Sequence, residues 1–170
     1  MLWNHSNVIG LAKASCTFCH GYGMRQVLMG EDVVCECVYR AIFRACHSRF
    51  RECVAMAEAS QVGGVSWERC WGPSGYRCFS RPREEYTADF FLVSARALRA
   101  YSELFRVFRL HHLAGLDWRV CCELLGVGRG KFYHLVYEIE GRIGRVLAEL
   151  EPYSLYPVSE YFAISNEGTR

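Results

Sequence analysis

The sequence predicts a mainly α-helical protein in which a small cysteine-bearing knuckle precedes one long helix and a C-terminal helical domain. Apolar residues recur at about every 3.6 positions over residues 38–59 and 84–150, which is the pattern of helices with one buried face. Cysteines and glycines gather in residues 16–37, and glycines and prolines in residues 60–82, as is typical of loops and linkers.

These patterns divide the chain into five expected segments. They are a lead-in and knuckle over 1–37, a basic amphipathic helix over 38–59, a linker over 60–83, a helical domain with an aromatic tail over 84–163, and a disordered end over 164–170. Pro152 is expected to end the last helix. Two prolines in residues 151–162 predict an irregular tail, whose aromatic side chains pack on the tail's own domain, with packing on a partner as the alternative.

Bulk composition indicates a globular chain and leaves its partners open. At 170 residues, 51% hydrophobic and 14% aromatic, the chain can bury a core. A net charge of +2 neither favours nor excludes nucleic acid, because a basic face can coexist with acidic residues elsewhere.

No segment approaches the roughly 20 apolar residues of a membrane span. Met1–Gly10 lacks a signal peptide, so a cytoplasmic protein without a membrane partner is expected.

Two close cysteine pairs, separated by fifteen residues, are the sharpest chemical signal. Short pairs joined by a loop fit one tetrahedral zinc ion, and four thiolates leave no open position, so the zinc would be structural. The predicted ligands are Cys16, Cys19, Cys35 and Cys37. Gly21 and Gly23 follow the first pair and permit the positive φ angles that aim amides toward sulfur. The alternatives are four unligated core thiols or a redox pair.

The other six cysteines predict core or linker positions, because a reducing cytoplasm disfavours disulfides. Cys121 and Cys122 belong to this group. A second metal site stays open as an alternative, and its ligands would be Cys46, Cys53, Cys70 and Cys78.

The helix expected over 38–59 has an apolar and a basic face. Its predicted inward positions are Val38, Ile42, Ala45, Cys46, Cys53, Val54 and Ala57. Arg40, Arg44, His47 and Arg51 lie at i, i+4, i+7 and i+11, which places them along one face. This stripe predicts phosphate contacts by the three arginines, with a solvated surface of scattered ion pairs as the alternative.

Two helices are expected before a break at Gly115. Over 84–98 and 100–113, the predicted inward residues are Tyr86, Phe90, Val93, Ala97, Leu98, Leu104, Val107, Phe108 and His111. After the break, Asp117 is a predicted N-cap, and Val120, Cys121, Leu124 and Leu125 form the apolar face of a short helix.

The next segment predicts a helix-turn-helix. Gly126 stops the short helix in a left-handed turn, and Val127 fills that turn. The second helix is expected to bury Phe132, Leu135, Val136, Ile139, Ile143 and Leu147. Since the second helix of this motif enters the major groove by its N-terminal part, the predicted DNA contacts are Arg129, Lys131 and His134, with Tyr137, Arg142 and Arg119 at the edge. The alternative is a plain helical hairpin, which nearby acidic residues such as Glu123 favour.

Residues 85–150 resemble region four of sigma factors, and the related fold of phage and mobile-element antitermination or late-gene regulators. The resemblance is carried by Leu116-Asp-Trp-Arg-Val-Cys-Cys-Glu-Leu-Leu-Gly126 and by Arg129-Gly-Lys-Phe-Tyr-His-Leu-Val-Tyr137. The knuckle is similar to a single DnaJ-type Cys-x-x-Cys-x-Gly-x-Gly repeat. The resemblance implies a regulator at promoter DNA or RNA polymerase, and not a complete sigma factor, because no promoter-melting region is recognisable.

The expected function is a DNA-binding transcription regulator with one structural zinc. The alternative is an adaptor that binds RNA polymerase or another protein without sequence-specific DNA binding. An enzyme is not expected, because the chain has no P-loop, dinucleotide fingerprint, Ser/His/Asp order or His-Glu-x-x-His. The adjacent His111 and His112 are expected to point apart on a helix, which suits neither a catalytic dyad nor a joint metal site.

Overall fold

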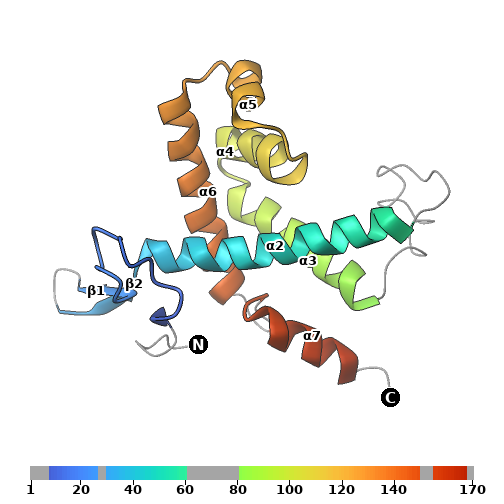
Figure 1. Ribbon diagram of the computed structural model, residues 1–170, viewed down its shortest axis with the longest axis horizontal. Helices are drawn as coiled ribbons and strands as arrows, with labels where there is room; N and C mark the ends of the chain where they lie inside the picture. The colour runs from blue at the N-terminus through green and yellow to red at the C-terminus, as the bar shows by residue number, and fades with distance from the viewer. Residues whose placement is uncertain (1–7, 27–29, 61–80, 150–154, 168–170) are drawn as a thin grey trace.

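The computed structural model describes residues 8–26, 30–60, 81–149 and 155–167, and confirms a mainly α-helical fold with a small N-terminal hairpin (Figure 1). The elements are β1 (Met24–Gln26), β2 (Asp32–Val34), α2 (Glu36–Ser60), α3 (Arg81–Leu98), α4 (Ser102–Val107), the π-helix η2 (Phe108–Leu113), α5 (Trp118–Leu125), α6 (Arg129–Glu149) and α7 (Val158–Glu167). Most of the linker expected over 60–83 and the last three residues of the expected disordered end lie outside the described residues.

Helix α2 is the long axis on which the other elements assemble. Figure 1 shows the hairpin at its N-terminal end, α6 crossing it, and α7 beneath it. Its predicted inward residues are buried, apart from the half-buried Ala45. Because hydrophobic burial is the main favourable term in folding, this continuous face explains why one helix contacts α3, α6 and α7.

Two glycines allow α6 to approach α2 closely. A Cβ on Gly144 would overlap the backbone carbonyl of Tyr39, and one on Gly141 would lie 2.6 Å from Oε2 of Glu36. Polar contacts flank this crossing. The Tyr39 hydroxyl donates to Glu149 at 2.9 Å, and Arg145 pairs with Glu36 at 2.5 Å.

The central core is aromatic and joins α2, α3 and η2. Phe50 and Phe90 stack with ring centroids 4.7 Å apart, and Phe43 and Phe108 complete the cluster around Phe90. The predicted inward residues of α3 and α4 are buried, except for the half-buried Ala97. The predicted inward residues of α6 are also buried. The periodicity therefore located the core correctly over most of the helical body.

The prediction that His111 and His112 point apart is wrong. Residues 108–113 form a π-helix, whose wider turn brings the two rings to a centroid distance of 5.0 Å. His112 is the buried member, and its ring also meets that of His47 at 5.2 Å. Nε2 of His47 donates to the His112 carbonyl at 2.9 Å, whereas Nε2 of His112 has no hydrogen-bond partner among the described residues.

Burial of His112 makes stability sensitive to acid. Burial, together with the charges of His47 and His111, lowers the pKa of His112 to about 3. The unfolded chain takes up this proton near pH 6.5 and the folded chain does not, so stability is lost as the pH falls below 6.5. We expect the free energy of unfolding to fall by about 2 kcal/mol between pH 7 and pH 5 in urea denaturation.

A pair of variants isolates this effect. His112→Phe removes the titrating ring and retains an aromatic side chain, so it should flatten the pH dependence. His134→Gln, at an exposed position, keeps the buried imidazole and therefore the acid sensitivity. A pH profile that is identical in wild type and His112→Phe would contradict this assignment.

The tail packs on its own domain, as predicted, but its irregular conformation was a wrong prediction. Residues 158–167 form α7, which begins just after Pro157, where proline is well tolerated in a helix. Tyr161 is buried against Tyr86 and donates to Asp89 at 2.7 Å, and Leu155 is fully buried. The aromatic residues therefore close the lower face of the α2–α3 pair.

The knuckle contains regular structure that the sequence did not predict. Strands β1 and β2 pair antiparallel, with Met24 opposite Val34. The described part of the lead-in also packs, because Val8 is fully buried. Within the described ranges, no helix combines the length and the apolar character that a bilayer-spanning segment needs.

Candidate metal centre and nucleic-acid surface

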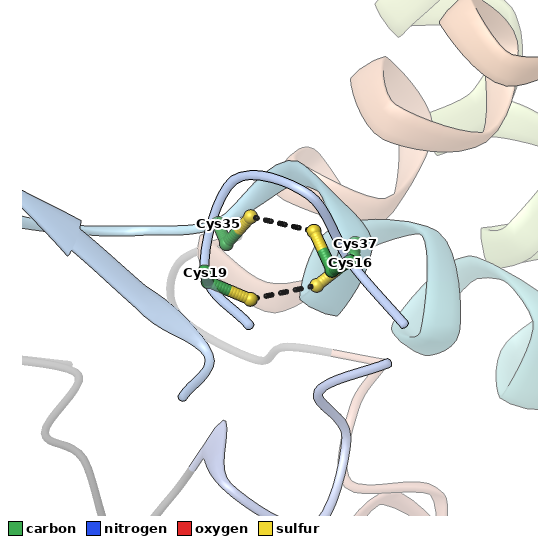
Figure 2. A group of neighbouring side chains, drawn as sticks. All are labelled: Cys16, Cys19, Cys35 and Cys37. Carbon is green, nitrogen blue, oxygen red and sulfur yellow. Dashed lines mark hydrogen bonds between the residues drawn. The ribbon is translucent and has the colours of Figure 1, made fainter. Parts of the chain in front are cut away.

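The four predicted cysteine ligands converge at the N-terminal end of α2 (Figure 2). All four are buried, and their sulfur atoms all lie within 4.8 Å of one another. The Cys16 and Cys35 sulfurs are 3.7 Å apart, and those of Cys19 and Cys37 are 3.5 Å apart. The first pair comes from the tight turn before β1, whereas the second spans the end of β2 and the first turn of α2.

This geometry fits a tetrahedral metal ion. Zinc–sulfur bonds of about 2.3 Å at tetrahedral angles require sulfurs roughly 3.8 Å apart. The observed separations are close to that value, and the donor set is four thiols. The cluster is therefore consistent with a zinc site, and among the described residues it is the one group that could hold a metal ion.

Backbone conformation around the first pair aims amides at sulfur. His20, Gly21 and Gly23 all have positive φ angles, of 49°, 87° and 77°. The amides of Phe18 and Cys19 hydrogen-bond to the Cys16 sulfur. Gly23 has a second role, because an added Cβ would lie 2.7 Å from the Val8 side chain. The predicted positive φ angles of the two glycines are therefore confirmed, whereas the amides that reach the Cys16 sulfur belong to residues that precede them.

The thiols of the cluster differ in acidity. Burial opposes ionisation of Cys16, but the backbone amides outweigh it and lower its pKa to about 6. Burial and the neighbouring sulfurs raise the pKa of Cys37 to about 12 and also raise that of Cys35. One thiolate therefore forms readily, and a bound cation would supply the charge that stabilises the others.

The proposed second cysteine site gains no support from the described residues. The Cys46 thiol donates to the Leu155 carbonyl at 3.6 Å, and burial raises its pKa to about 12. Cys53 is buried in the α2 core face. Cys70 and Cys78 lie outside the described residues. Cys46 and Cys53 are therefore core residues.

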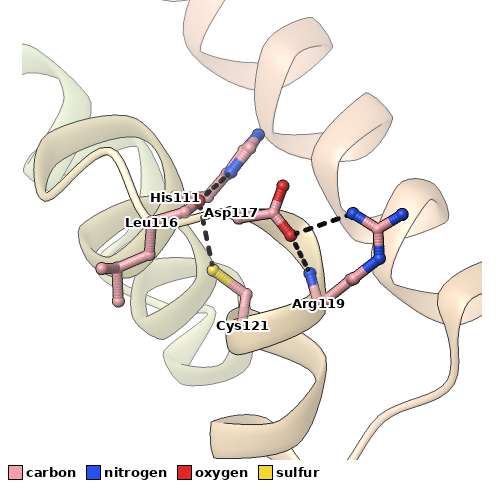
Figure 3. Close-up of polar contacts among 5 residues, drawn as sticks. All are labelled: His111, Leu116, Asp117, Arg119 and Cys121. Atoms are coloured by element: carbon pink, nitrogen blue, oxygen red, sulfur yellow. Dashed lines mark hydrogen bonds and ion pairs between the residues drawn. The ribbon is translucent and has the colours of Figure 1, made fainter.

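The α5–turn–α6 unit (residues 118–149) has the predicted local geometry. The Asp117 side chain accepts from the Arg119 amide at 2.9 Å and caps α5 (Figure 3). Gly126 ends this helix at φ 65°. Nδ1 of His111 and the Cys121 thiol both donate to the Leu116 carbonyl. These two bonds attach the start of α5 to the π-helix.

The apolar face predicted for α5 is partly wrong. Cys121 is buried and Leu125 half-buried, but Val120 and Leu124 are 42% and 57% exposed. Trp118 and Cys122 were not predicted to face inward, but both pack against the core. The helix is therefore rotated relative to the prediction, because the aromatic ring of Trp118 packs on Tyr133 of α6.

Three of the predicted DNA contacts lie exposed on the first two turns of α6. The Arg129 guanidinium lies over the rings of Trp118 and Tyr133, at 5.3 and 5.7 Å from their centroids. Lys131 pairs with Glu103 at 2.5 Å, and His134 faces solvent. Figure 1 shows that this end of α6, together with α5, lies away from α2.

The other predicted contacts are more dispersed. Arg119 is exposed, stacks over Trp118 at 4.6 Å and lies 3.7 Å from Asp117. Tyr137 and Arg142 lie farther along α6, and Arg142 pairs with Glu138 at 2.9 Å. The structure therefore places four of the six residues around the α5–α6 turn and two nearer the knuckle.

The basic face of α2 is not a continuous stripe toward solvent. Arg44 makes a two-pronged contact with Glu140 of α6, at 2.7 and 3.2 Å. His47 packs among aromatic rings, and burial lowers its pKa. Arg51 donates to the Leu113 carbonyl at 3.3 Å, and Arg40 lies 5.3 Å from the Tyr137 ring centroid. Phosphate contacts by the three arginines stay a prediction, and the face mainly joins α2 to α6 and η2.

A groove between the knuckle and α6 was not predicted. It has a volume of about 840 Å³ and runs along α6 from His134 to Val146, with Phe18 of the knuckle on its other side. An adjoining hollow of about 350 Å³ includes Lys13 and two cysteines of the cluster, Cys16 and Cys37. The sequence shows only that an aromatic residue, Phe18, lies between two predicted ligands, and the exposure of its ring is seen only in the structure.

No protein-family model matches the chain, and neither a search of curated proteins nor one of solved structures finds a match. The resemblance to sigma region four therefore rests on the sequence motifs of residues 116–137 and stays a prediction.

Proposed function

We propose that the protein is a DNA-binding transcription regulator, with α6 as its recognition helix and one structural zinc in the knuckle. The observation that carries the proposal is the α5–turn–α6 unit, in which a capped short helix, a left-handed glycine and an exposed basic helix start follow one another. In helix-turn-helix proteins, the corresponding helix start enters the major groove.

The charges at the start of α6 suit this role. Arg129 and Lys131 are exposed, and the first backbone amides of a helix favour an anion such as phosphate. Stacking on Trp118 and Tyr133 restrains Arg129, so less side-chain entropy is lost when it contacts a base or phosphate. Duplex DNA would compete with Glu103 for Lys131. Phosphate contacts by Arg129 and Lys131 would release counterions, which predicts salt-dependent binding.

Zinc serves structure in this proposal. Four thiolates complete a tetrahedral shell and leave no position for substrate or water, so the ion would supply folding energy to the knuckle and no catalysis. The knuckle would then hold the N-terminal end of α2, and α2 supports α6 through their close crossing.

The first test compares duplex binding by wild type and by Arg129→Ala with Lys131→Ala. In gel shifts with mixed-sequence duplex at low salt, we expect the double variant to bind at least tenfold more weakly. We also expect its salt slope to fall by about one unit per lost phosphate contact.

A charge-matched control separates a specific site from general attraction. Arg25→Ala with Arg109→Ala removes the same charge from exposed positions in β1 and η2 and should leave binding nearly intact. Equal weakening in both double variants, or binding that neither changes, would count against α6 as the recognition helix.

An adaptor function is the second candidate, and the exposed Val120 and Leu124 favour it. They lie four residues apart on α5, so they present adjacent apolar side chains to solvent. An adaptor would recover RNA polymerase in a pull-down from an extract treated with nuclease, and would show no duplex affinity in the gel shift.

A further inference from the structure

The groove between the knuckle and α6 carries an inference beyond duplex recognition. We propose that it binds a short single strand of nucleic acid, with bases stacking on Phe18 and Tyr137 and the backbone passing Arg40 and Lys13. All four residues line the groove or the hollow that continues it, and Phe18, Arg40 and Tyr137 line both.

Two exposed aromatic rings mark the groove. Phe18 is 70% exposed and Tyr137 is 50% exposed, although both rings would gain from burial. Phe18 lies between Cys16 and Cys19, so the knuckle fixes its backbone while its ring faces outward. Rings held in this way form a stacking platform that needs little reorganisation when a base arrives.

The charge of the groove is positive once its ion pairs are counted. Its acidic residues Glu36 and Glu138 pair with Arg145 and Arg142, and the Arg44 of the adjoining hollow pairs with Glu140. Arg40 and Lys13 have no acidic partner in the described part of the chain. The uncompensated charge therefore lies beside the two aromatic rings, which suits a polyanion with planar bases.

Shape favours a single strand over a duplex. A recognition helix must present a convex surface to enter the major groove, whereas residues 137–146 of α6 form one side of a concave groove. From His134 to Arg145 the groove follows α6 for about 16 Å, which corresponds to roughly five nucleotides at stacked spacing. An acidic peptide would satisfy the charge but would leave the two ring faces without stacking partners.

The groove begins at His134, and it includes Tyr137 and Arg142, which were predicted only at the edge of the duplex contact. A strand could therefore run from the α6 N-terminus toward the knuckle. The inference does not depend on duplex binding by Arg129 and Lys131, because neither residue lines the groove. Failure of one proposal therefore leaves the other standing.

The test measures fluorescence anisotropy of a labelled oligothymidylate of about twelve nucleotides with the full zinc-loaded chain. We expect Phe18→Ala and Tyr137→Ala each to weaken binding about tenfold. Tyr22→Ala removes an exposed aromatic ring of the knuckle outside the groove, and should bind as wild type does. Arg129→Ala with Lys131→Ala should retain single-strand binding and lose duplex binding.

Zinc content is measured for each variant, because Phe18 lies between two predicted ligands. If Phe18→Ala loses zinc, Tyr137→Ala decides the question, since Tyr137 lies on α6 and outside the segments that carry the four cysteines. The proposal is overturned if wild type does not bind the oligonucleotide, or if Tyr137→Ala binds it as tightly as Tyr22→Ala. It is also overturned if polyglutamate of equal charge competes as well as unlabelled oligonucleotide, because the groove would then be a peptide site.

Discussion

Cys37→Ser is expected to abolish stoichiometric zinc binding and to unfold the knuckle, while the helical body stays folded. Cys37 lies in the first turn of α2, and its sulfur is 3.5 Å from that of Cys19. A serine hydroxyl cannot replace a thiolate ligand in this buried cluster. Since loss of even outer-shell partners weakens metal sites by 10–100-fold, we expect zinc affinity to fall by more than about 100-fold.

The knuckle has little else to hold it. Its strands have three residues each, and an isolated two-stranded hairpin is at best marginally stable in water. Structural zinc in small peptides contributes about 10–16 kcal/mol of apparent binding energy, which becomes folding energy when no site exists in the unfolded chain. We therefore expect amide hydrogens of residues 16–26 and 30–35 to exchange freely in Cys37→Ser, and those of α6 to stay protected.

Cys122→Ser is the matched control. Cys122 is a half-buried cysteine of α5 and lies outside the cluster, so this variant should keep one zinc per chain and an ordered knuckle. Two results would contradict the assignment. One is wild-type protein that contains no zinc after purification in chelator-free buffer, and the other is a Cys37→Ser variant that retains one zinc per chain.

The four-cysteine cluster and most of the helical core could be predicted because each depends on local spacing. Two short cysteine pairs define a cluster by their own geometry, and buried positions of α6 such as Phe132 and Ile139 repeat at the helical period. Asp117 and Gly126 likewise act on the residues beside them. For such features, the relevant interactions lie within a few residues of the signal.

The errors arose where distant residues decide the outcome. The π-helix turns His112 into an aromatic core that α2 and α3 provide, and no local pattern indicates this. Trp118 sets the rotation of α5 by packing on Tyr133. The groove forms because Phe18 and Tyr137 line the same hollow, although they are more than a hundred residues apart in sequence. Ring packing and surface shape of this kind require the tertiary structure.

Gly144→Ala is expected to cause the largest loss of stability of any single methyl addition in α6. The new Cβ would overlap the Tyr39 carbonyl and lie 3.3 Å from the Phe43 Cβ. Because that carbonyl belongs to the backbone of α2, relief requires one helix to move. Overpacking of this kind typically costs about 1–3 kcal/mol, and a rigid backbone obstacle places it at the upper end. The higher helix propensity of alanine offsets about 1 kcal/mol of this cost. We therefore expect urea denaturation to show a net decrease of about 2 kcal/mol in the free energy of unfolding.

Two other glycines of α6 provide an internal scale for this effect. A Cβ on Gly130 would meet no atom within 4 Å, so Gly130→Ala should be neutral or stabilising by up to about 1 kcal/mol. A Cβ on Gly141 would meet only the carboxylate of Glu36, which can rotate away at the expense of its pairing with Arg145. From most to least stable, the expected order of the variants is therefore Gly130→Ala, Gly141→Ala and Gly144→Ala. Gly141 and Gly144 lie in the interior of α6 and gain most from alanine, whereas Gly130 lies in its first turn. A Gly144→Ala protein as stable as Gly130→Ala would therefore show that α2 and α6 do not cross this closely.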